Sequence, residues 1–418
     1  MILRARTVLP VSQPPIADGA LAISGNRITA VGSWKNFTQH ASRVPHHSIL
    51  DLGEVILLPG LVNAHCHLDY TGMAGEFLPP KSFTDWIKLI TTAKGGWTYS
   101  DFAQSWLNGA QMLLRSGTTT VADFESVPEL LPEAWSATPL RVFSFLEMTG
   151  VKSRREPRAI LDAAVEKTAS LGRSSRNAAG LAPHAPYSTM PDLLRLTAET
   201  ARRHGWLLAT HAAESVEEFE MFQNSRGVMF GWLKRNQRDN LDCGLGSPVA
   251  HLARNDMLGE NLAVIHANLL APGDAELLGR NRVHVVHCPR SHDYFSHPPF
   301  PRRQLADAGV NLCLGTDSLA TVRKTKHQKL ELNLFEEMRR LAAADKTVLP
   351  REILRMATIN GAKALGMAGQ IGELSKNAFA DLIAIPFAGK NEDICDAVLH
   401  HASTVSASMI DGQWAIAT

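Results

Sequence analysis

The stretch LPGLVNAHCHLDY, residues 58–70, places His65 and His67 one residue apart at the end of an apolar run. On a β-strand, side chains two residues apart point to the same face, so the two imidazoles would lie together and Cys66 would point away. Such a pair could hold a divalent metal ion. Histidines are also common as hydrogen-bonded core residues, so the spacing alone leaves both interpretations open.

Other apolar runs also end in residues that can bind metals or transfer protons. These residues are His184, His211, His266, His287 and Asp317. Three imidazoles and a carboxylate suit Zn²⁺ or another borderline divalent ion. Glu214 follows His211 by three residues, and a carboxylate near a metal-bound water can act as a general acid and base. The alternative for Glu214 is a solvated glutamate at a helix start, like its neighbours in EEFE.

The runs that carry these residues alternate with segments of helical character. Strands are expected at LVNAHCH, TTTVADF, RVFSFLEM, AGLAPHAP, WLLATHAA, LAVIHAN, VHVVHCP and VNLCLGTDS. Helices are expected at DFAQSWLNGAQMLLRSG, PRAILDAAVEKTASLG and MPDLLRLTAETARRHG, which end at or near glycines. Eight strands alternating with helices predict an α/β fold, a (β/α)8 TIM barrel, whose strand ends meet at one mouth. An open doubly wound sheet is less favoured, because no glycine-rich phosphate loop follows the first strand.

The sequence pattern at both ends of the chain differs from that of the middle, because it consists of short β segments without the alternating helices. Short β segments flank Gly25-Asn26 near the start and Asp411-Gly412 near the end, which are hairpin signals. We expect a small β-sandwich-like domain built from both termini. The predicted boundaries are 1–57 for its N-terminal part, 58–366 for the barrel and 367–418 for its C-terminal part.

Composition excludes several classes of partner. A net charge of +1 without a basic stripe argues against nucleic acid, and no apolar run is long enough to suggest a membrane span. The first residues lack the apolar core of a signal peptide. Five scattered cysteines without paired spacing favour a reducing, cytoplasmic location.

The motifs PGLVNAHCHLDYTG, APHAPYS, THAAES, VIHANLL, HCPRS and LGTDS, in this order, resemble the amidohydrolase superfamily. They are most similar to its deaminase/chlorohydrolase branch, and the similarity spans residues 20–412. The resemblance implies a small-molecule substrate, a homodimer, and a mononuclear centre whose metal ligands are His65, His67, His211 and Asp317. It also implies that Glu214 carries protons, that His266 orients the attacking hydroxide, and that His184 contacts substrate.

One absence narrows the expected reaction. Binuclear relatives use a carboxylated lysine near the end of strand 4, where this chain reads LAPHAPYS. The resemblance therefore implies a hydrolytic deaminase of a purine-like or other N-heteroaromatic amine, with Zn²⁺, or alternatively Fe²⁺, as the metal. A dechlorinase or cyclic amide hydrolase could use the same site, and a non-catalytic scaffold is the alternative from another class.

The chain departs from the common family pattern after strands 7 and 8. Relatives often read HCPxSN, whereas this chain has HCPRSH, with Arg290 and His292, and a basic stretch at 323–326. This variant and the loop FLPPKSFTDWIKLI are similar to the aminodeoxyfutalosine-deaminase-like subgroup. We therefore expect Arg290 and Trp86 among the substrate-binding residues, although Trp86 also fits the core of an amphipathic helix.

Overall fold

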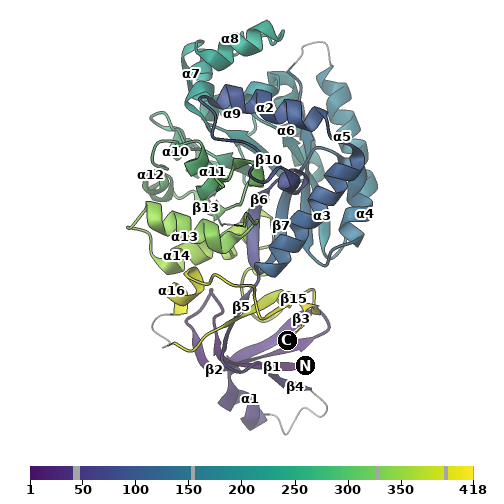
Figure 1. Cartoon of the computed structure of the whole chain (residues 1–418), viewed down its shortest axis with the longest axis vertical. Helices are drawn as coiled ribbons and strands as arrows, with labels where there is room; N and C mark the ends of the chain where they lie inside the picture. Colours follow the sequence, from purple (N-terminus) through teal and green to yellow (C-terminus); the bar gives the residue numbers. More distant parts are fainter. Residues whose placement is uncertain (41–47, 152–155, 325–328, 390–393, 418) are drawn as a thin grey trace.

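The protein consists of a barrel of parallel strands covered by helices, and a separate β-sheet built from both ends of the chain (Figure 1). The computed structural model describes residues 1–40, 48–151, 156–324, 329–389 and 394–417. In the described parts of the chain, none of the helices combines the length and apolar character that a bilayer-crossing segment requires.

The barrel strands follow one another in chain order, each parallel to the next, and all are largely buried. They are β6 (Leu61–Cys66), β7 (Thr118–Glu125), β8 (Arg141–Met148), β9 (Asn177–Pro183), β10 (Leu208–Ala212), β11 (Leu262–His266), β12 (His284–His287) and β13 (Asn311–Leu314). The amide of Thr316 donates to the carbonyl of His65 at 3.0 Å, and Cys66 forms a parallel bridge with Asp317. These contacts close the barrel between its last and first strands, which confirms the predicted fold.

The three helices expected from the sequence are present. They are α3 (Tyr99–Arg115), α5 (Pro157–Leu171) and α6 (Pro191–His204). Thr98 and Asp101 form a capping box at the start of α3, and Gly205 ends α6 in the left-handed conformation, with φ of 65°. The other barrel-side helices are α4 (Leu131–Ser136), α9 (Pro248–Arg254), α10 (Asp274–Arg280), α12 (Arg302–Asp307), α13 (Leu334–Ala344), α14 (Pro350–Met356) and α15 (Ile359–Ala364).

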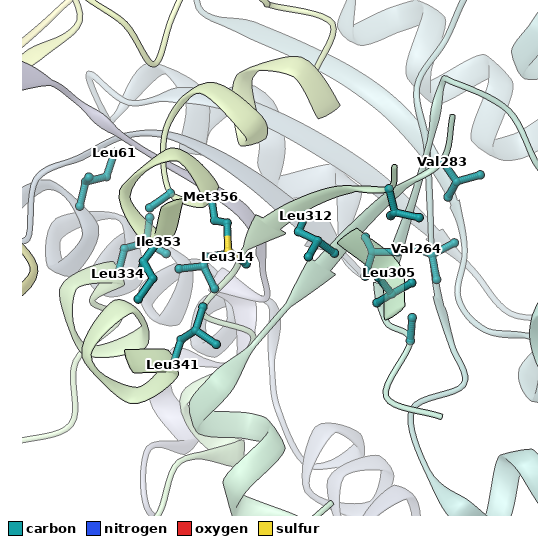
Figure 2. Close-up of a cluster of buried hydrophobic side chains, with 14 of the residues drawn as sticks. Leu61, Val264, Val283, Leu305, Leu312, Leu314, Leu334, Leu341, Ile353 and Met356 are labelled. Carbon is teal, nitrogen blue, oxygen red and sulfur yellow. The ribbon is translucent and has the colours of Figure 1, made fainter. Parts of the chain in front are cut away.

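Apolar side chains fill the layer between strands and helices. Figure 2 shows part of this layer, where Val264, Leu312 and Leu314 of the strands lie near Leu305 and Ile353 of the helices. A second buried cluster, with Phe124, Phe143 and Phe145, fills the inside of the barrel. With both faces of the strands buried, the strand sequences read as nearly continuous apolar runs.

Further helices lie in the loops that follow the strands. They are α2 (Phe83–Gly95), α7 (Val216–Asn224), α8 (Val228–Arg235) and α11 (Pro289–Tyr294). In Figure 1, α2, α7 and α8 lie at the end of the barrel opposite the terminal sheet. The amide of Phe83 at the start of α2 donates to the Glu217 carboxylate of α7 at 2.8 Å, which joins two of these loop helices.

The terminal sheet has the order β16-β15-β14-β5-β1-β2-β3, with β4 paired to β1. Its strands are β1 (Ile2–Val8), β2 (Ile16–Ser24), β3 (Arg27–Ser33), β4 (Ile49–Asp51), β5 (Val55–Pro59), β14 (Leu382–Pro386), β15 (Ala407–Ile410) and β16 (Gln413–Ile416). The short helix α1 (Trp34–His40) packs against β2 and β3 of this sheet, whereas α16 (Ile394–Leu399) packs against α13 and α14 of the barrel. Both predicted hairpins are present. Because β14 pairs with β5 along its length, hydrogen bonds join strands from both termini into one continuous sheet, which forms the expected small β-domain.

A buried ion pair connects the sheet to the barrel. Arg141, the first residue of β8, holds the carboxylate of Asp381 through two hydrogen bonds of 2.8 and 3.1 Å. Both side chains are about 1% exposed, and the guanidinium also lies over the ring of Phe379. The Asp381 carboxylate accepts a further bond from the amide of Asp411, so one pair contacts both the barrel and the C-terminal hairpin.

Candidate active site

His65 and His67 lie at the carboxyl end of β6 and point to the same side, as the alternation predicts. Their ring centroids are 4.9 Å apart, and both side chains are buried. Cys66, between them, packs in the outer apolar layer with Leu68 and Trp106. The imidazoles therefore face the barrel axis.

Asp317 reaches the two histidines because β13 closely approaches β6. A Cβ added to Gly315 would lie 2.8 Å from the carbonyl oxygen of His65, so only glycine fits there. The side chain of Asn63 bonds both the amide and the hydroxyl of Thr316, at 3.1 and 2.8 Å. This pairing places Asp317 directly beyond the seam.

The ring nitrogens of three histidines converge on one point. Nε2 of His211 lies 3.3 Å from Nε2 of His65 and 3.4 Å from Nε2 of His67. Oδ1 of Asp317 lies 3.7 Å from Nε2 of His65 and 3.9 Å from Nε2 of His67. Nitrogens bound to one zinc ion at about 2.0–2.1 Å in a tetrahedron lie about 3.3–3.4 Å apart. His211 Nδ1 lies 3.0 Å from the carbonyl of His184, which fixes the hydrogen on Nδ1 and leaves the Nε2 lone pair free. The spacing and the tautomer both fit a divalent metal.

The protonation states also fit. Burial, together with the neighbouring imidazoles, lowers the pKa of His65 and of His67 well below the usual value. Burial likewise lowers the pKa of His211. Burial alone would raise the pKa of Asp317, but His266, His67 and a bond from Ser291 outweigh it and keep that pKa below its usual value. Neutral imidazoles beside a buried carboxylate are the donor set that a divalent cation requires.

Glu214, in the loop after β10, and His266, the last residue of β11, face the same centre. Glu214 Oε1 lies 3.5 Å from His266 Nε2, and both side chains are buried. Burial and the charge of Asp317 raise the pKa of Glu214 well above that of an ordinary glutamate, whereas burial lowers the pKa of His266. These shifts favour the protonated form of Glu214 and the neutral form of His266, which makes Glu214 a potential acid.

A cavity of about 750 Å³ opens onto this centre. His184 lines it, with Nδ1 held 2.7 Å from the hydroxyl of Ser188. Trp86 of α2 also lines it, while its ring packs against Tyr294 and Phe295. Trp86 is therefore both a packed core residue and part of the cavity wall, and its contact with substrate stays a prediction. Phe83 and Trp232 extend the same apolar wall.

Arg290 does not belong to this cavity, which corrects its expected place among the substrate-binding residues. Its Nε contacts Oε1 of Glu337 at 2.5 Å, and its terminal nitrogens bond the carbonyl of Glu331 at 3.1 Å. The guanidinium is thus already neutralised by a fully buried carboxylate on α13. Arg323 is likewise bonded elsewhere, to Ser296 at 2.9 Å, and residues 325–326 of the basic stretch lie outside the described part of the chain.

Glu147, which is not among the site residues expected from the sequence, lines the cavity from the carboxyl end of β8. Within the described chain its carboxylate has no hydrogen-bond or ion-pair partner. Burial would raise the pKa of Glu147, but Lys94 and the nearby histidines lower it below the usual value, so the group is ionised. Lys94 of α2 lines the same region and bonds the hydroxyl of Tyr70. Side chains at the carboxyl ends of barrel strands face the mouth of the barrel, and Glu147 occupies such a position. This criterion therefore identifies Glu147 from the sequence as well.

Comparisons with known proteins agree with this geometry. The chain is 32% identical over 407 residues to the 5-methylthioadenosine/S-adenosylhomocysteine deaminase of Syntrophobacter fumaroxidans, covering 88% of this chain and 80% of that protein. Its fold matches Helicobacter pylori aminofutalosine deaminase in complex with methylthio-coformycin, with a TM-score of 0.86, 23% identity and 99% coverage of both chains. It also matches an adenosine deaminase from Xanthomonas campestris with bound zinc, with a TM-score of 0.84, 22% identity and coverage of 99% and 92%.

The family assignment follows from a match over most of the chain. The model of the amidohydrolase family matches residues 56–415, which include every barrel strand and every residue of the centre described above. The chain therefore belongs to the amidohydrolase family.

Proposed function

We propose that this protein is a metal-dependent hydrolytic deaminase that acts on a 6-aminopurine nucleoside or a close analogue and releases ammonia. The observation that carries the proposal is the convergence of three neutral imidazoles and Asp317 beside the Glu214–His266 pair, at the base of one cavity. The deaminase names of the similar proteins agree with it.

His65, His67, His211 and Asp317 would hold one divalent metal, for which Zn²⁺ is the first choice. The three nitrogen donors and the single carboxylate match the preferences of zinc, and Fe²⁺ is the alternative. When bound, such an ion lowers the pKa of a coordinated water toward about 7 and so supplies a nucleophile at neutral pH.

Glu214 and Asp317 would then carry out the proton transfers of the reaction. As water adds to the amine-bearing ring carbon, protonated Glu214 donates its proton to the adjacent ring nitrogen. His266 and Asp317 orient the water, and Asp317 accepts the proton that it loses. Glu214, now a carboxylate, receives that proton and delivers it to the amino group. The C–N bond breaks, ammonia leaves, and the proton of the added hydroxyl passes to Glu214, so the ring keeps the oxygen as a carbonyl and the carboxyl is protonated again.

The cavity suits an aromatic ring that carries a polar substituent. Phe83, Trp86 and Trp232 provide apolar and aromatic surface, and His184 can donate to a ring nitrogen. Glu147 offers an unpaired carboxylate and Lys94 a cation, which together complement vicinal hydroxyls such as those of a ribose. A nucleoside derivative, including aminodeoxyfutalosine, satisfies all these groups.

Ammonia release from a panel of compounds tests the proposal. The panel contains adenosine, 5′-deoxyadenosine, 5′-methylthioadenosine, S-adenosylhomocysteine, aminodeoxyfutalosine, adenine and a 6-chloropurine nucleoside. Turnover of an aminopurine nucleoside supports the deaminase. Chloride release without ammonia release would favour the dechlorinase, and failure of the metal-loaded protein on every compound would overturn the proposal.

The homodimer and the cytoplasmic location stay predictions that rest on the sequence. Sedimentation of the purified protein tests the first, and fractionation of the source cells tests the second.

A further inference from the structure

Two buried side chains from other parts of the chain form hydrogen bonds with the backbone of Glu214, one with its amide and one with its carbonyl. Its amide donates to Oε2 of Glu218 on α7 at 2.9 Å, and its carbonyl accepts from Nδ2 of Asn268 at 3.0 Å. Glu218 and Asn268 are buried, and neither lines the cavity. The two side chains therefore act on Glu214 and not on a bound substrate.

Asn268 is held in turn by His292 of α11. His292 Nδ1 lies 3.0 Å from Oδ1 of Asn268. Because the amide nitrogen of Asn268 donates to Glu214, its oxygen must face His292 and accept a hydrogen from Nδ1. Burial lowers the pKa of His292 to about 4, so the ring is neutral and carries its hydrogen on Nδ1. The chain of bonds runs from the loop after β12, through the loop after β11, to the loop after β10.

The backbone around Glu214 needs such support. Ala213 has φ of 53°, His266 of 76° and Ala267 of 48°, all in the left-handed region that residues with a Cβ rarely adopt. Strained loops keep their shape only when surrounding contacts fix them. The 3.5 Å separation of Glu214 and His266 thus depends on the groups that bind these two loops together.

We propose that Asn268 and His292 are positioning residues, which act through the Glu214 carbonyl to set where the Glu214 carboxyl lies relative to the substrate. The inference rests on the proposed function, in which Glu214 carries the proton. It also gives a role to the histidine of HCPRSH, which the family resemblance left unexplained. A misplacement of about 1 Å at a reacting group costs on the order of 10²-fold in rate.

Three substitutions separate the hydrogen bonds from simple packing. Asn268→Asp keeps the size and the acceptor but removes the donor to the Glu214 carbonyl. His292→Leu removes the donor to Asn268, whereas His292→Asn keeps an N–H at the Nδ1 position. His297→Leu is the matched control. The ring centroids of His297 and His292 are 5.4 Å apart, and among the described residues His297 has no hydrogen bond to Asn268.

Steady-state kinetics on the metal-loaded full chain give the first readout. We expect Asn268→Asp to lower kcat about 10- to 100-fold and His292→Leu about 10-fold, with KM changed less than threefold and metal content unchanged. His292→Asn should recover kcat to within about threefold of the parent, and His297→Leu should resemble the parent. A merely structural role would lower the folded fraction without this selective rescue by asparagine.

Hydrogen exchange of the backbone, followed by mass spectrometry, gives a readout that needs no substrate. Exchange across residues 212–216 should speed up at least threefold in Asn268→Asp and His292→Leu, and should return to the parent rate in His292→Asn. If exchange responds in this way but no compound is deaminated, the proposed function fails while the positioning stands. Unchanged exchange in both variants, or equal loss of kcat in His292→Leu and His292→Asn, would overturn the positioning.

Discussion

Asp317 Oδ1 lies 3.7 Å from Nε2 of His65, across the seam where the last barrel strand meets the first. The approach depends on Asn63, which binds the residue before Asp317, and on Gly315, which leaves room for the His65 carbonyl. The candidate metal centre is therefore built on the closure of the barrel. The predictions that follow test this centre, the cavity beside it and the supports behind it.

Removal of the metal should destabilise the protein, because a buried carboxylate would then lie among neutral imidazoles without a cation. A ligand that binds only the folded state contributes about 2.7 kcal/mol at a hundredfold excess over Kd. We expect dialysis against a chelator to lower Tm and zinc to restore it. Asp317→Asn should lower the zinc content measured by plasma mass spectrometry. A chain that never binds stoichiometric Zn or Fe would contradict this assignment.

Glu214→Gln should abolish most turnover and leave the metal bound. The amide cannot donate a carboxyl proton, and general acid–base catalysis contributes about 10²–10⁴-fold in rate. Zinc content and Tm should match the parent, since Glu214 is not among the converging ligand atoms. Glu220→Gln, on helix α7 just after Glu214, where the carboxylate pairs with Arg226 and does not line the cavity, is the matched control. Substantial activity in the Glu214 variant would show that another group carries the proton.

Glu147→Gln should reduce the preference for substrates with free vicinal hydroxyls. Loss of a charge-assisted hydrogen bond costs about 1.5–3 kcal/mol, so kcat/KM for a ribonucleoside should fall about 10- to 100-fold. The same variant should change kcat/KM little for the 2′,3′-dideoxy analogue, which lacks the donors. Equal losses for both compounds would mean that Glu147 supports the cavity without contacting the hydroxyls.

Stability at low pH should depend on Asp242. Burial would raise the pKa of this carboxyl, but the hydrogen bonds and charge of Arg238 lower it below the usual value. A depressed folded-state pKa contributes stability above the unfolded value of about 3.9, and this contribution is lost as pH falls through the folded value. Arg238 also bonds the carbonyls of Tyr187 and Pro186 in the loop after β9, so the pair supports part of the cavity wall.

The corresponding experiment compares Tm of the parent and Asp242→Asn across pH. At pH 7 the variant should melt several degrees lower, because Arg238 is left buried without its partner, at a cost of about 3–5 kcal/mol. The difference should begin to shrink as pH falls below the unfolded value of about 3.9, and it should be lost only below the folded pKa of Asp242, where the parent carboxyl is neutral as well. A difference that stays constant down to pH 3 would contradict the assignment.

The Arg141–Asp381 pair should stabilise the junction of barrel and sheet without affecting catalysis. Arg141→Met leaves the Asp381 carboxylate buried and uncompensated, for which the expected cost is about 3–5 kcal/mol. Tm should fall, while kcat at 25 °C should stay at the parent value because the pair lies at the opposite end of the barrel from the cavity. The double variant Arg141→Met, Asp381→Leu should recover much of the loss, and failure to recover would show that the packing around Phe379 matters more than the charges.

Much of this structure could be predicted from local sequence signals. Strands buried on both faces leave apolar runs, and their carboxyl ends meet at one mouth, so His65, His211 and Asp317 could be placed together without any contact being visible. The hairpins at Gly25 and Asp411 are likewise local, since φ is positive there.

The failures involve partners that are far apart in the chain. Arg290 was expected to bind the substrate, but it forms an ion pair with Glu337 of a later helix. The motif HCPRSH contains no pattern that indicates this ion pair. Pairing of β5 with β14, from opposite ends of the chain, also leaves no local signal, so the order of strands in the terminal sheet could not be predicted. Glu147 differs from these cases because its signal is local: it lies near the carboxyl end of the strand RVFSFLEM, where a barrel places functional side chains.

The close approach at Gly315 has a consequence for how the protein matures. Two of the four proposed ligands stand on the first barrel strand and one lies just after the last, so a nascent chain that lacks the eighth strand has no complete site. Metal uptake would then mark the moment at which the barrel closes. The fraction of molecules that retain zinc would then measure the fraction with a closed barrel. A residue larger than glycine at position 315 should give a chain that is synthesised but does not bind the metal.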